Sequence, residues 1–337
     1  MISRPIHSLF LLFLAFVLSS GCSRSPRVVV YCAHDQEFAD HVLRTFAKET
    51  AIQVDVIYDT EANKAISLYE NLVRETKRPR CDVHWNNEIL ATMRLQKQGI
   101  LQPYASPSAL PYPAPFKAAD HTWTAFAARA RVLIVNTDKV KKDDLPRGLW
   151  ELTEPKWQGQ VAMAKPHFGT TATHAACLFQ AWGKDKASDF YRKLKANDVQ
   201  VVAGNKQVAV AVGVGQYAVG MTDTDDAMAE ITAGRPVVMI FPDSDTLFIP
   251  NTVAMIKNCP NPEGAQKLID YLLSVEVETR LAQSASRQIP LNPQVKLDSL
   301  KPIETPRTVR ALPVDFAKAA ERWAESQAFL VEEFGLR

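Results

Sequence analysis

Three carboxylates lie within four residues of one another, at Asp223, Asp225 and Asp226. They follow an apolar run, residues 217–221, that predicts a buried strand, and they precede a segment with the periodicity of a helix. Carboxylates this close repel one another and are costly to desolvate together. A bound cation, or a ligand that donates several hydrogen bonds, would relieve that repulsion. The alternative interpretation is a solvated turn in which Thr224 or Asp225 caps the helix.

A second polar group consists of Gly169, Thr170 and Thr171, which lead into an apolar helical segment at residues 175–182. A glycine and two threonines at a helix start present backbone N–H groups and hydroxyls to one point, which suits an anion. A capped helix that binds nothing fits the same residues equally well.

Three short apolar runs in the first third of the chain predict strands, and each is followed by a segment of helical periodicity. They span residues 28–32, 54–58 and 81–85. His34 and Asp35 come after the first run, and Asn87 and Glu88 come after the third. Alternating strands and helices predict a largely parallel sheet covered on both faces. Because ligands bind outside the carboxyl ends of such strands, we expect these polar residues to line a crevice.

The length of 337 residues and the hydrophobic content of 47% are sufficient for two cores, so we expect two domains. A predicted strand at residues 130–135 leads into the second domain, and another at residues 253–256 leads back. The expected boundaries place the first part of lobe 1 at 26–128, lobe 2 at 129–247, and the return to lobe 1 with the C-terminal helices at 248–337. The net charge is only +2, and no basic run is interleaved with aromatic residues, so a nucleic-acid partner is not expected.

The N-terminus has the pattern of an export signal at residues 1–22. Basic residues precede an apolar segment, residues 9–18, that is too short to span a bilayer, and small residues then lead to Cys22. The pattern is similar to a bacterial lipoprotein signal, in which the cysteine becomes the lipidated first residue. Such signals usually carry leucine where this sequence has Ser19. We expect export to the periplasm or cell envelope, with a lipid anchor on Cys22.

Four further cysteines lie far apart in the sequence, at Cys32, Cys81, Cys177 and Cys259. Without a Cys-x-x-Cys pair, a zinc site is not expected. A disulfide is compatible with an oxidising compartment, but spacing alone assigns none. We expect buried free thiols.

A series of motifs follows in a specific order over most of the exported chain. They are Val29-Val30-Tyr31 with Asp35-Gln36-Glu37-Phe38, Cys81-Asp82-Val83-His84-Trp85-Asn86-Asn87-Glu88, Gly169-Thr170-Thr171-Ala172-Thr173-His174, Pro250-Asn251-Thr252-Val253-Ala254, Asn261-Pro262-Glu263 and Gln288-Ile289-Pro290-Leu291-Asn292-Pro293. In this order they resemble the substrate-binding proteins of bacterial ABC importers, and within them the ferric-iron-binding group called periplasmic transferrins. The resemblance implies the type 2 periplasmic-binding-protein fold, which is α/β. Its two lobes are mainly parallel sheets covered by helices, and two crossing strands join them.

The resemblance also implies a ligand set. The tyrosine pair of the iron binders falls on Asp225 and Asp226 of this sequence. Their first-strand ligand falls on Asp35 or His34, and their glutamate falls on Asn87, with Glu88 adjacent. The residues that match the anion site are Gly169, Thr170, Thr171 and Asn205. The anion half therefore keeps its residue types, whereas the metal half has lost both phenolates.

Two kinds of ligand fit this set. Fe(III) favours anionic oxygen, so Asp35, Asp225 and Asp226 form a candidate metal set, with phosphate or carbonate as the accompanying anion. Carboxylates together with Asn87 would equally suit Ca(II) or Mg(II). An organic anion would instead place its charged end at Thr170 and its hydroxyls or amine at the two last aspartates. Some relatives of the iron binders take up phosphorylated sugars or phosphonates.

We therefore expect a monomeric, non-enzymatic binding protein that captures ferric iron or another hard cation with its anion and delivers it to an ABC permease and ATPase. No resident cofactor is predicted. A phosphorylated or carboxylated small molecule, such as a sugar phosphate or a phosphonate, is the alternative ligand. The sequence has no Gly-x-Ser-x-Gly elbow, which argues against a hydrolase of that kind. The rivals are an exported metal-dependent hydrolase that uses Asp225, Asp226 and His34, and a sensory binding protein without a permease.

The lipid anchor can be tested directly. If the mature chain starts at a lipidated Cys22, Cys22→Ser should move the protein from the membrane fraction to the soluble fraction, because the acyl chains are lost. Fractionation and immunoblotting of both forms measure this. Unchanged membrane association of the variant would contradict the anchor.

Overall fold

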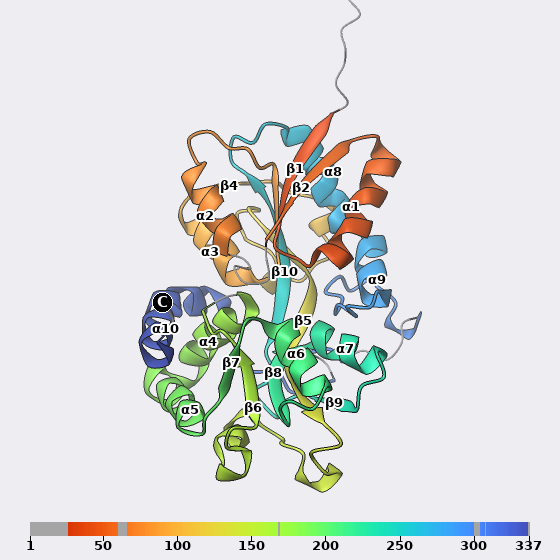
Figure 1. Ribbon diagram of the computed structural model, residues 1–337. Helices are drawn as coiled ribbons and strands as arrows, with labels where there is room; N and C mark the ends of the chain where they lie inside the picture. Colours follow the sequence, from red (N-terminus) through yellow and green to blue (C-terminus); the bar gives the residue numbers. More distant parts are fainter. Residues whose placement is uncertain (1–25, 60–65, 168, 300–303, 307, 336–337) are drawn as a thin grey trace, which may run out of the picture.

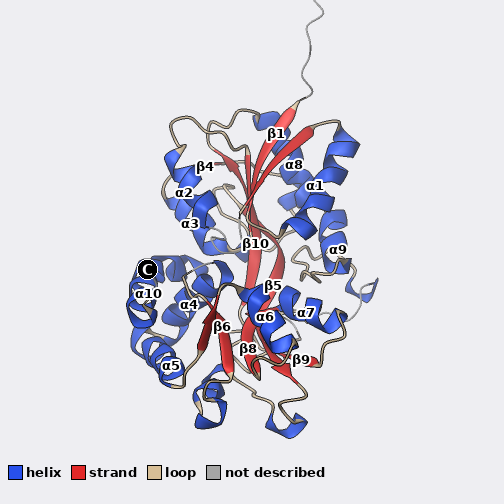
Figure 2. Ribbon diagram, in the orientation of Figure 1, coloured by secondary structure: helices blue, strands red, loops and turns tan. Residues whose placement is uncertain are grey.

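The computed structural model describes residues 26–59, 66–167, 169–299, 304–306 and 308–335. The molecule has two lobes, one above the other in Figure 1, and two long strands run from one lobe into the other. Helices lie outside the strands in both lobes (Figure 2). The predicted export signal, with Cys22, lies outside the described residues.

The first lobe contains three parallel strands in the order β2–β1–β3. Its strands are β1 (Arg27–Cys32), β2 (Gln53–Tyr58), β3 (Val83–Asn86) and the short β4 (Leu101–Gln102). Its helices are α1 (Gln36–Thr50), α2 (Ile66–Arg74), α3 (Ile89–Lys97), α8 (Pro262–Leu272) and α9 (Val275–Gln283). Helix α1 buries Ala39, Val42, Leu43 and Phe46, which recur at the spacing of one helical face. The predicted alternation of strand and helix is confirmed.

The second lobe repeats this arrangement, with parallel strands in the order β8–β6–β7. Its strands are β6 (Val161–Ala164), β7 (Gln200–Val202), β8 (Val219–Asp223) and β9 (Val237–Ile240). Its helices are α4 (Gly169–Trp182), α5 (Lys184–Ala196), α6 (Asn205–Gly213) and α7 (Thr224–Thr232). Gly220 lets α6 lie close to β8, because a Cβ there would come within 2.4 Å of Val208 Cγ1.

Strand β8 ends two residues later than the apolar run predicts. Asp223 is its last residue and also the N-cap residue of α7, so the prediction that Thr224 or Asp225 would be the cap is wrong. Thr224 instead accepts a hydrogen bond from the backbone N–H of Ala130 at 3.1 Å. This contact holds the start of α7 against the neighbouring strand.

Strands β5 (Thr124–Asn136) and β10 (Phe248–Ile256) join the lobes. They run antiparallel to each other; β10 also pairs with β3, and β5 with β8 and β9. Every residue of β5 is buried. At its first-lobe end the strand pairs with β10, and in the second lobe it lies between β8 and β9. Both strands are longer than the sequence predicted, since pairing continues across the junction. The two-lobe fold with two crossing strands is confirmed.

An irregularity interrupts the pairing of the crossing strands. The register of β10 against β5 shifts between Pro250 and Asn251, and Ala127 on β5 has a φ of 44°. The freed N–H of Ala127 donates to Glu278 Oε1 at 2.7 Å. Glu278, which is fully buried on α9, also accepts from the N–H groups of Leu291 and Asn292. One carboxylate thus holds the bulged part of the crossing in place.

The C-terminal helix α10 (Phe316–Phe334) lies against α4 and α5 of the second lobe and also reaches α3 of the first. The guanidinium of Arg94 on α3 lies 4.5 Å from the ring centre of Tyr69 and 4.9 Å from that of Trp323 on α10. In the described ranges no helix, α10 included, combines the length and the apolar character that crossing a bilayer requires.

The four cysteines of the described chain are free, as expected. Cys32, Cys81 and Cys177 are buried, and Cys259 is half-buried. Burial raises the pKa of the Cys81 and Cys177 thiols well above the usual value, so both stay protonated at neutral pH.

Glu278 leads to a prediction about pH. Burial raises the pKa of its carboxyl from 4.5 to about 7, against the smaller opposite effect of its amide donors. Between these two values the folded protein holds a proton that the unfolded chain releases, so stability is lost as the pH rises through this window. Glu278→Gln removes this titration. As the pH rises through the window, the free energy of unfolding of the variant should therefore fall less steeply than that of the wild type. The two slopes should differ by up to about 1.4 kcal/mol per pH unit.

Urea unfolding at several pH values across this window measures the difference. Glu276→Gln, on the exposed side of the same helix, is the matched control and should keep the wild-type slope. An equally steep decline in Glu278→Gln would show that another group is responsible.

Candidate functional site

Two buried ion pairs lie where the lobes meet. Arg129 and Arg131 are two residues apart on β5, so both side chains leave the same face of the strand, and each is 2% exposed. Arg131 is paired in register with Asp223 on β8, and its Nη1 lies 2.7 Å from Asp223 Oδ1. Arg129 Nη1 lies 3.5 Å from Asp225 Oδ2, where the same antiparallel register would continue.

These pairs correct the expectation of an acidic cluster without counter-charge. Asp223 and Asp225 each face a guanidinium, and Asp226 lies in the first turn of α7, where the helix N-terminus favours negative charge. Burial alone would lower the pKa of Arg129, but Asp225, Asp223, Asp35 and Asp226 together raise it, so the guanidinium stays charged. The protein itself therefore supplies much of the counter-charge that a ligand was expected to bring.

Asp223 is the centre of a hydrogen-bond network. Its Oδ2 accepts from Thr170 Oγ1 at 2.5 Å and from Asn205 Nδ2 at 3.1 Å. Asn205 Oδ1 in turn accepts from Thr171 Oγ1 at 3.0 Å and from Arg131 Nη1 at 2.9 Å. The threonine hydroxyls that the sequence offered to a bound anion thus donate to Asp223 and Asn205 within the protein.

Arg129 and Asp225 connect this network to the first lobe. Arg129 Nη2 lies 3.0 Å from His34 Nδ1 and 3.3 Å from Asn251 Oδ1, and Gln288 Nε2 donates to Asp225 Oδ2 at 3.2 Å. Because a guanidinium only donates, His34 Nδ1 accepts and the ring proton sits on Nε2. The pair therefore depends on side chains from the end of β1, from β10 and from the segment after α9.

A small inner cavity lies beside the two pairs, with a volume of about 20 Å³, which is room for one water molecule or an ion. Arg129, Lys165 and Asn87 contribute to its wall. Helices α4, α6 and α7 begin at or beside this cavity, so three positive helix ends converge on it. Arg129 Nε and Asn87 Oδ1 are buried, and among the described residues neither has a hydrogen-bond partner. The cavity thus offers one donor and one acceptor to a ligand.

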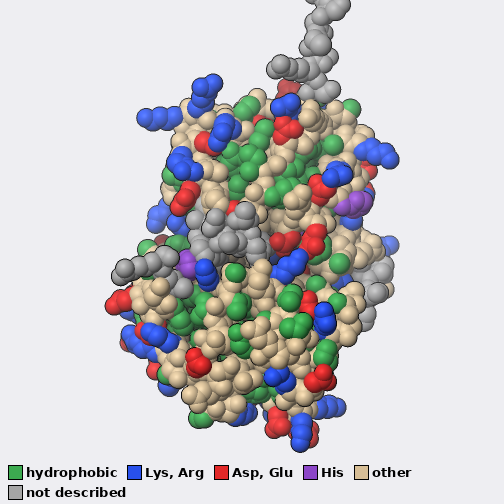
Figure 3. Space-filling view, viewed as in Figure 1, with side chains coloured by type: hydrophobic (Ala, Val, Ile, Leu, Met, Phe, Trp, Pro, Cys, Tyr) green, Lys and Arg blue, Asp and Glu red, His purple; other side chains and the backbone are tan. Residues whose placement is uncertain are grey.

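A larger outer recess, of about 730 Å³, opens between α1 and the start of α6. His34 and Asp35 line it from the first lobe, and Lys206 lines it from the second. Lys206 Nζ lies 3.3 Å from Glu37 Oε1, and because both side chains are more than half exposed this contact between lobes is weak. Acidic and basic side chains lie next to each other at this waist (Figure 3).

The structure brings most of the predicted site residues together. Those in the wall of the inner cavity are Asn87, Gly169, Thr170, Thr171, Asn205, Asp223 and Asp226, and those in the outer recess are His34 and Asp35. Asp225 lies behind the cavity in its pair with Arg129. Glu88 has the contacts of a helix cap: it accepts from the N–H groups of Leu90 and Ala91, and from Thr173 Oγ1 at 2.7 Å.

Sequence reasoning missed Arg129, Arg131 and Lys165. Arginine is rarely buried unless it is paired, so two arginines at alternate positions of an otherwise apolar strand were a usable signal. Lys165 follows β6 directly, at the same edge of the sheet as the other predicted residues, and this position was the available signal.

Asp223, Asp225 and Asp226 can bring one ligand atom each within 4.8 Å of one another. This group differs from the metal set implied by the resemblance, because Asp223 takes the place of Asp35, which lines the outer recess. Carboxylate oxygens suit a hard cation. Two buried guanidinium groups beside them oppose it.

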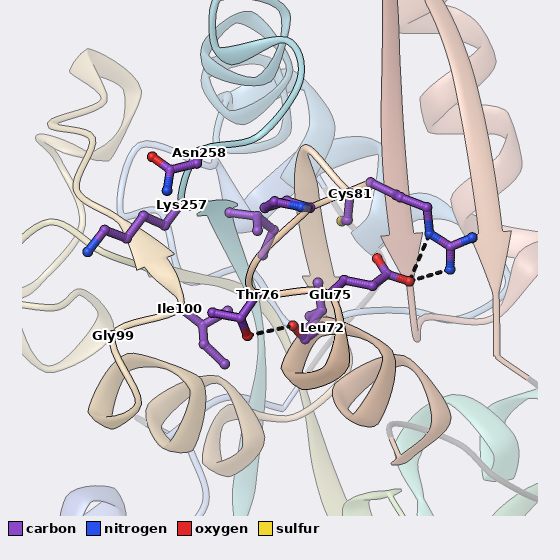
Figure 4. Close-up of a pocket in the computed structure, with 11 residues that line it drawn as sticks. Leu72, Glu75, Thr76, Cys81, Gly99, Ile100, Lys257 and Asn258 are labelled. Carbon is purple, nitrogen blue, oxygen red and sulfur yellow. Dashed lines mark hydrogen bonds and ion pairs between the residues drawn. The ribbon is translucent and has the colours of Figure 1, made fainter.

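Another cavity, of about 180 Å³, lies at the opposite end of β3 from Asn87 (Figure 4). Glu75 lies in its wall and is already bound by Arg80 and by the hydroxyl of Tyr31 at 2.9 Å. The thiol of Cys81, also in this wall, donates to the carbonyl of Val83. Glu75 and Arg80 of this cavity are thus paired with each other, and the candidate site is the one between the lobes, where polar groups of both lobes converge.

Two lobes on crossing strands, with polar side chains of both lobes around a cavity between them, define a two-lobe periplasmic binding protein. The model of the bacterial extracellular solute-binding proteins matches residues 90–320, and the chain belongs to that family. The resemblance found in the sequence is confirmed, and the homologues are binding proteins rather than enzymes.

The names of proteins similar to this chain mention different ligands. Iron uptake protein A1 of Synechocystis sp. is 26% identical over 344 residues, covering 90% of this chain and 94% of its own length. AfuA of Actinobacillus pleuropneumoniae, with fructose-6-phosphate bound, has a TM-score of 0.82 and 23% identity, covering 93% of this chain and 99% of that one. Iron-bound HitA of Pseudomonas aeruginosa has a TM-score of 0.83 and 19% identity, covering 91% of this chain and 99% of that one. The shared fold therefore leaves the solute of this chain to be argued from its site.

The Arg129–Asp225 pair can be tested with a double-mutant cycle. Arg129→Met or Asp225→Leu leaves one buried charge without its partner, and each should lower the free energy of unfolding by about 3–5 kcal/mol. The double variant should lose clearly less than the sum of the two. Urea unfolding measures all four proteins. The exposed pair Asp189–Lys193 on α5 is the control and should show a coupling below about 1 kcal/mol. Additive losses at Arg129 and Asp225 would contradict the pairing.

Proposed function

We propose that this chain is the extracytoplasmic solute-binding component of an ABC importer, and that its solute is a small organic anion carrying hydroxyl or amino groups. The observation that carries the proposal is the buried guanidinium of Arg129 at a cavity where three helix N-termini converge. Such a place attracts an acidic group.

The acidic end of the solute would bind Arg129 and Lys165 at the start of α4. Arg129 Nε has no hydrogen-bond partner among the described residues, and a buried donor left unsatisfied is costly, so a phosphate or carboxylate oxygen there gains a full hydrogen bond. Asn87 Oδ1 and the carboxylate of Asp226 would accept from hydroxyl or amino groups of the same molecule. Both lobes then contact one ligand, since Asn87 follows β3 and the other residues belong to the second lobe or the crossing strand.

A cation is disfavoured at Asp223 and Asp225 by the bonds that these residues already make. Asp225 Oδ2 faces Arg129 and Gln288, and Asp223 faces Arg131 as well as two neutral donors. Fe(III) would have to compete with two fixed positive charges at close range, which is unfavourable in a buried site.

Ferric iron with a synergistic anion is the second candidate. It is favoured by the convergence of three carboxylates within 4.8 Å and by an inner cavity with room for an ion. The iron uptake and iron-bound relatives named above point the same way. An organic anion is larger than the inner cavity, so the lobes must move apart to admit it. Hinge motion between the lobes, as in other binding proteins of this kind, would provide that opening.

Binding would couple to closure through contacts between the lobes. Thr173 on α4 donates to Glu88 at the start of α3, and Lys206 faces Glu37 across the mouth. We further propose that the lobes divide near residues 128/129 and 247/248, that the chain acts as a monomer, and that Cys22 anchors it to the membrane beside its permease and ATPase.

The proposal predicts which ligands stabilise the protein. Sugar phosphates or small hydroxy acids should raise the melting temperature of the wild type, because a ligand that binds the folded state stabilises it by mass action. Asp226→Asn should bind such a ligand roughly tenfold or more weakly, since a hydrogen bond to a charged group contributes about 1.5–3 kcal/mol. Asp189→Asn, on an exposed helix of the same lobe, should bind as the wild type does.

Thermal shift and titration calorimetry with a panel of these anions, and with iron plus phosphate or carbonate, measure the outcome. A wild-type shift with iron and none with the organic anions would replace the first candidate by the second. Undiminished binding by Asp226→Asn would remove this aspartate from the site.

A further inference from the structure

We infer that Asp223 acts as a resident anion: its carboxylate occupies a complete oxyanion-binding site built by Arg131, Thr170 and Asn205. This site would otherwise accept a small free oxyanion such as formate, acetate or phosphate. Asp223 is therefore a specificity-determining residue: it keeps small anions off Arg131, Thr170 and Asn205 and leaves Arg129 and Lys165 to the acidic end of the solute.

The donors that meet Asp223 come from three separate elements. Arg131 on β5 donates to Oδ1 at 2.7 Å, Thr170 in the first turn of α4 donates to Oδ2 at 2.5 Å, and Asn205 at the start of α6 donates to Oδ2 at 3.1 Å. A guanidinium, a hydroxyl and an amide at two helix N-termini are the groups that proteins use to hold phosphates and carboxylates. The residues that match the anion site of the iron binders thus keep their chemistry, but their acceptor belongs to the chain itself.

The local structure explains why this carboxylate sits there. Asp223 is opposite Arg131 in the antiparallel register of β8 and β5, so its side chain faces the guanidinium without rearrangement. It is the N-cap residue of α7, yet its side chain makes no capping hydrogen bond to that helix. The carboxylate is directed to the neighbouring donors instead of to its own helix.

A tethered carboxylate has an advantage over a free one. Its effective concentration at the donors is set by the fold, and a free anion would have to displace it from three hydrogen bonds at once. The pair and its hydroxyl donor are also almost completely buried, because Asp223, Arg131 and Thr170 are each 2% exposed. Arg131 Nε remains buried, and the described residues offer it no acceptor. Among the described residues, Asp223 is the only carboxylate that forms an ion pair with Arg131.

The test is chemical rescue of Asp223→Gly, which removes the carboxylate and leaves room for a small anion beside Arg131. The variant should have a lower melting temperature than the wild type, and formate, acetate or phosphate should restore part of the loss in a saturable manner. At ten times the dissociation constant of the anion, the folding equilibrium should shift by about elevenfold. Sodium chloride at equal ionic strength should have no comparable effect. The wild type, in which Asp223 already occupies these donors, should respond to the same anions clearly less than the variant does.

Two variants control for a general effect of charge. Asp226→Gly removes a carboxylate from the same turn of α7, and Asp223→Asn keeps the volume of the side chain, so neither should be rescued. If Asp223→Gly does not fold unaided, its refolding yield with and without formate replaces the melting temperature as the readout. Equal responses to formate and chloride in Asp223→Gly, or equal rescue of Asp226→Gly, would overturn the inference. Because no transported solute is used, the result is independent of the solute proposed above.

Discussion

Burial of two arginines on one strand is the constraint on which the layout of the cleft depends. A guanidinium remains charged under all conditions that leave the protein folded, so it needs a carboxylate nearby when it is buried. At Arg131 the strand paired with β5 is β8, and the antiparallel register places Asp223 opposite Arg131. Asp225 meets Arg129 one step further along, at the point where β8 has already turned into α7. The acidic turn is thus half of a ladder of ion pairs.

The same strand that carries the arginines also joins the lobes. Arg129 contacts His34 and Asn251, which belong to the first lobe and to the second crossing strand, as well as Asp225 in the second lobe. A rotation of one lobe against the other must therefore change the surroundings of this guanidinium. Charge balance in the cleft and the angle between the lobes are therefore physically coupled.

Neighbours with nearly the same chain path are described with iron or with a sugar phosphate. Fold alone therefore does not select the solute. In this chain Asp225 and Asp226 stand where the resemblance places tyrosines. Arg129 forms an ion pair with Asp225, so one of these two carboxylates already has a positive partner without any ligand.

The sequence by itself determined the order of the elements, the two crossing strands and the edge of the sheet at which polar residues gather. Periodicity, strand length and residue type are local properties, and they predicted Asn87, Thr170 and Asp223 at strand ends and helix starts, while Asn205 was implied by the family resemblance. Which donor meets which acceptor was decided by the tertiary structure. Whether Thr170 is free for an anion depends on Asp223, which is 53 residues away, and Asp223 depends in turn on Arg131, 92 residues away. Such partners are set by strand register and helix placement, and neither can be deduced from the residues adjacent in sequence.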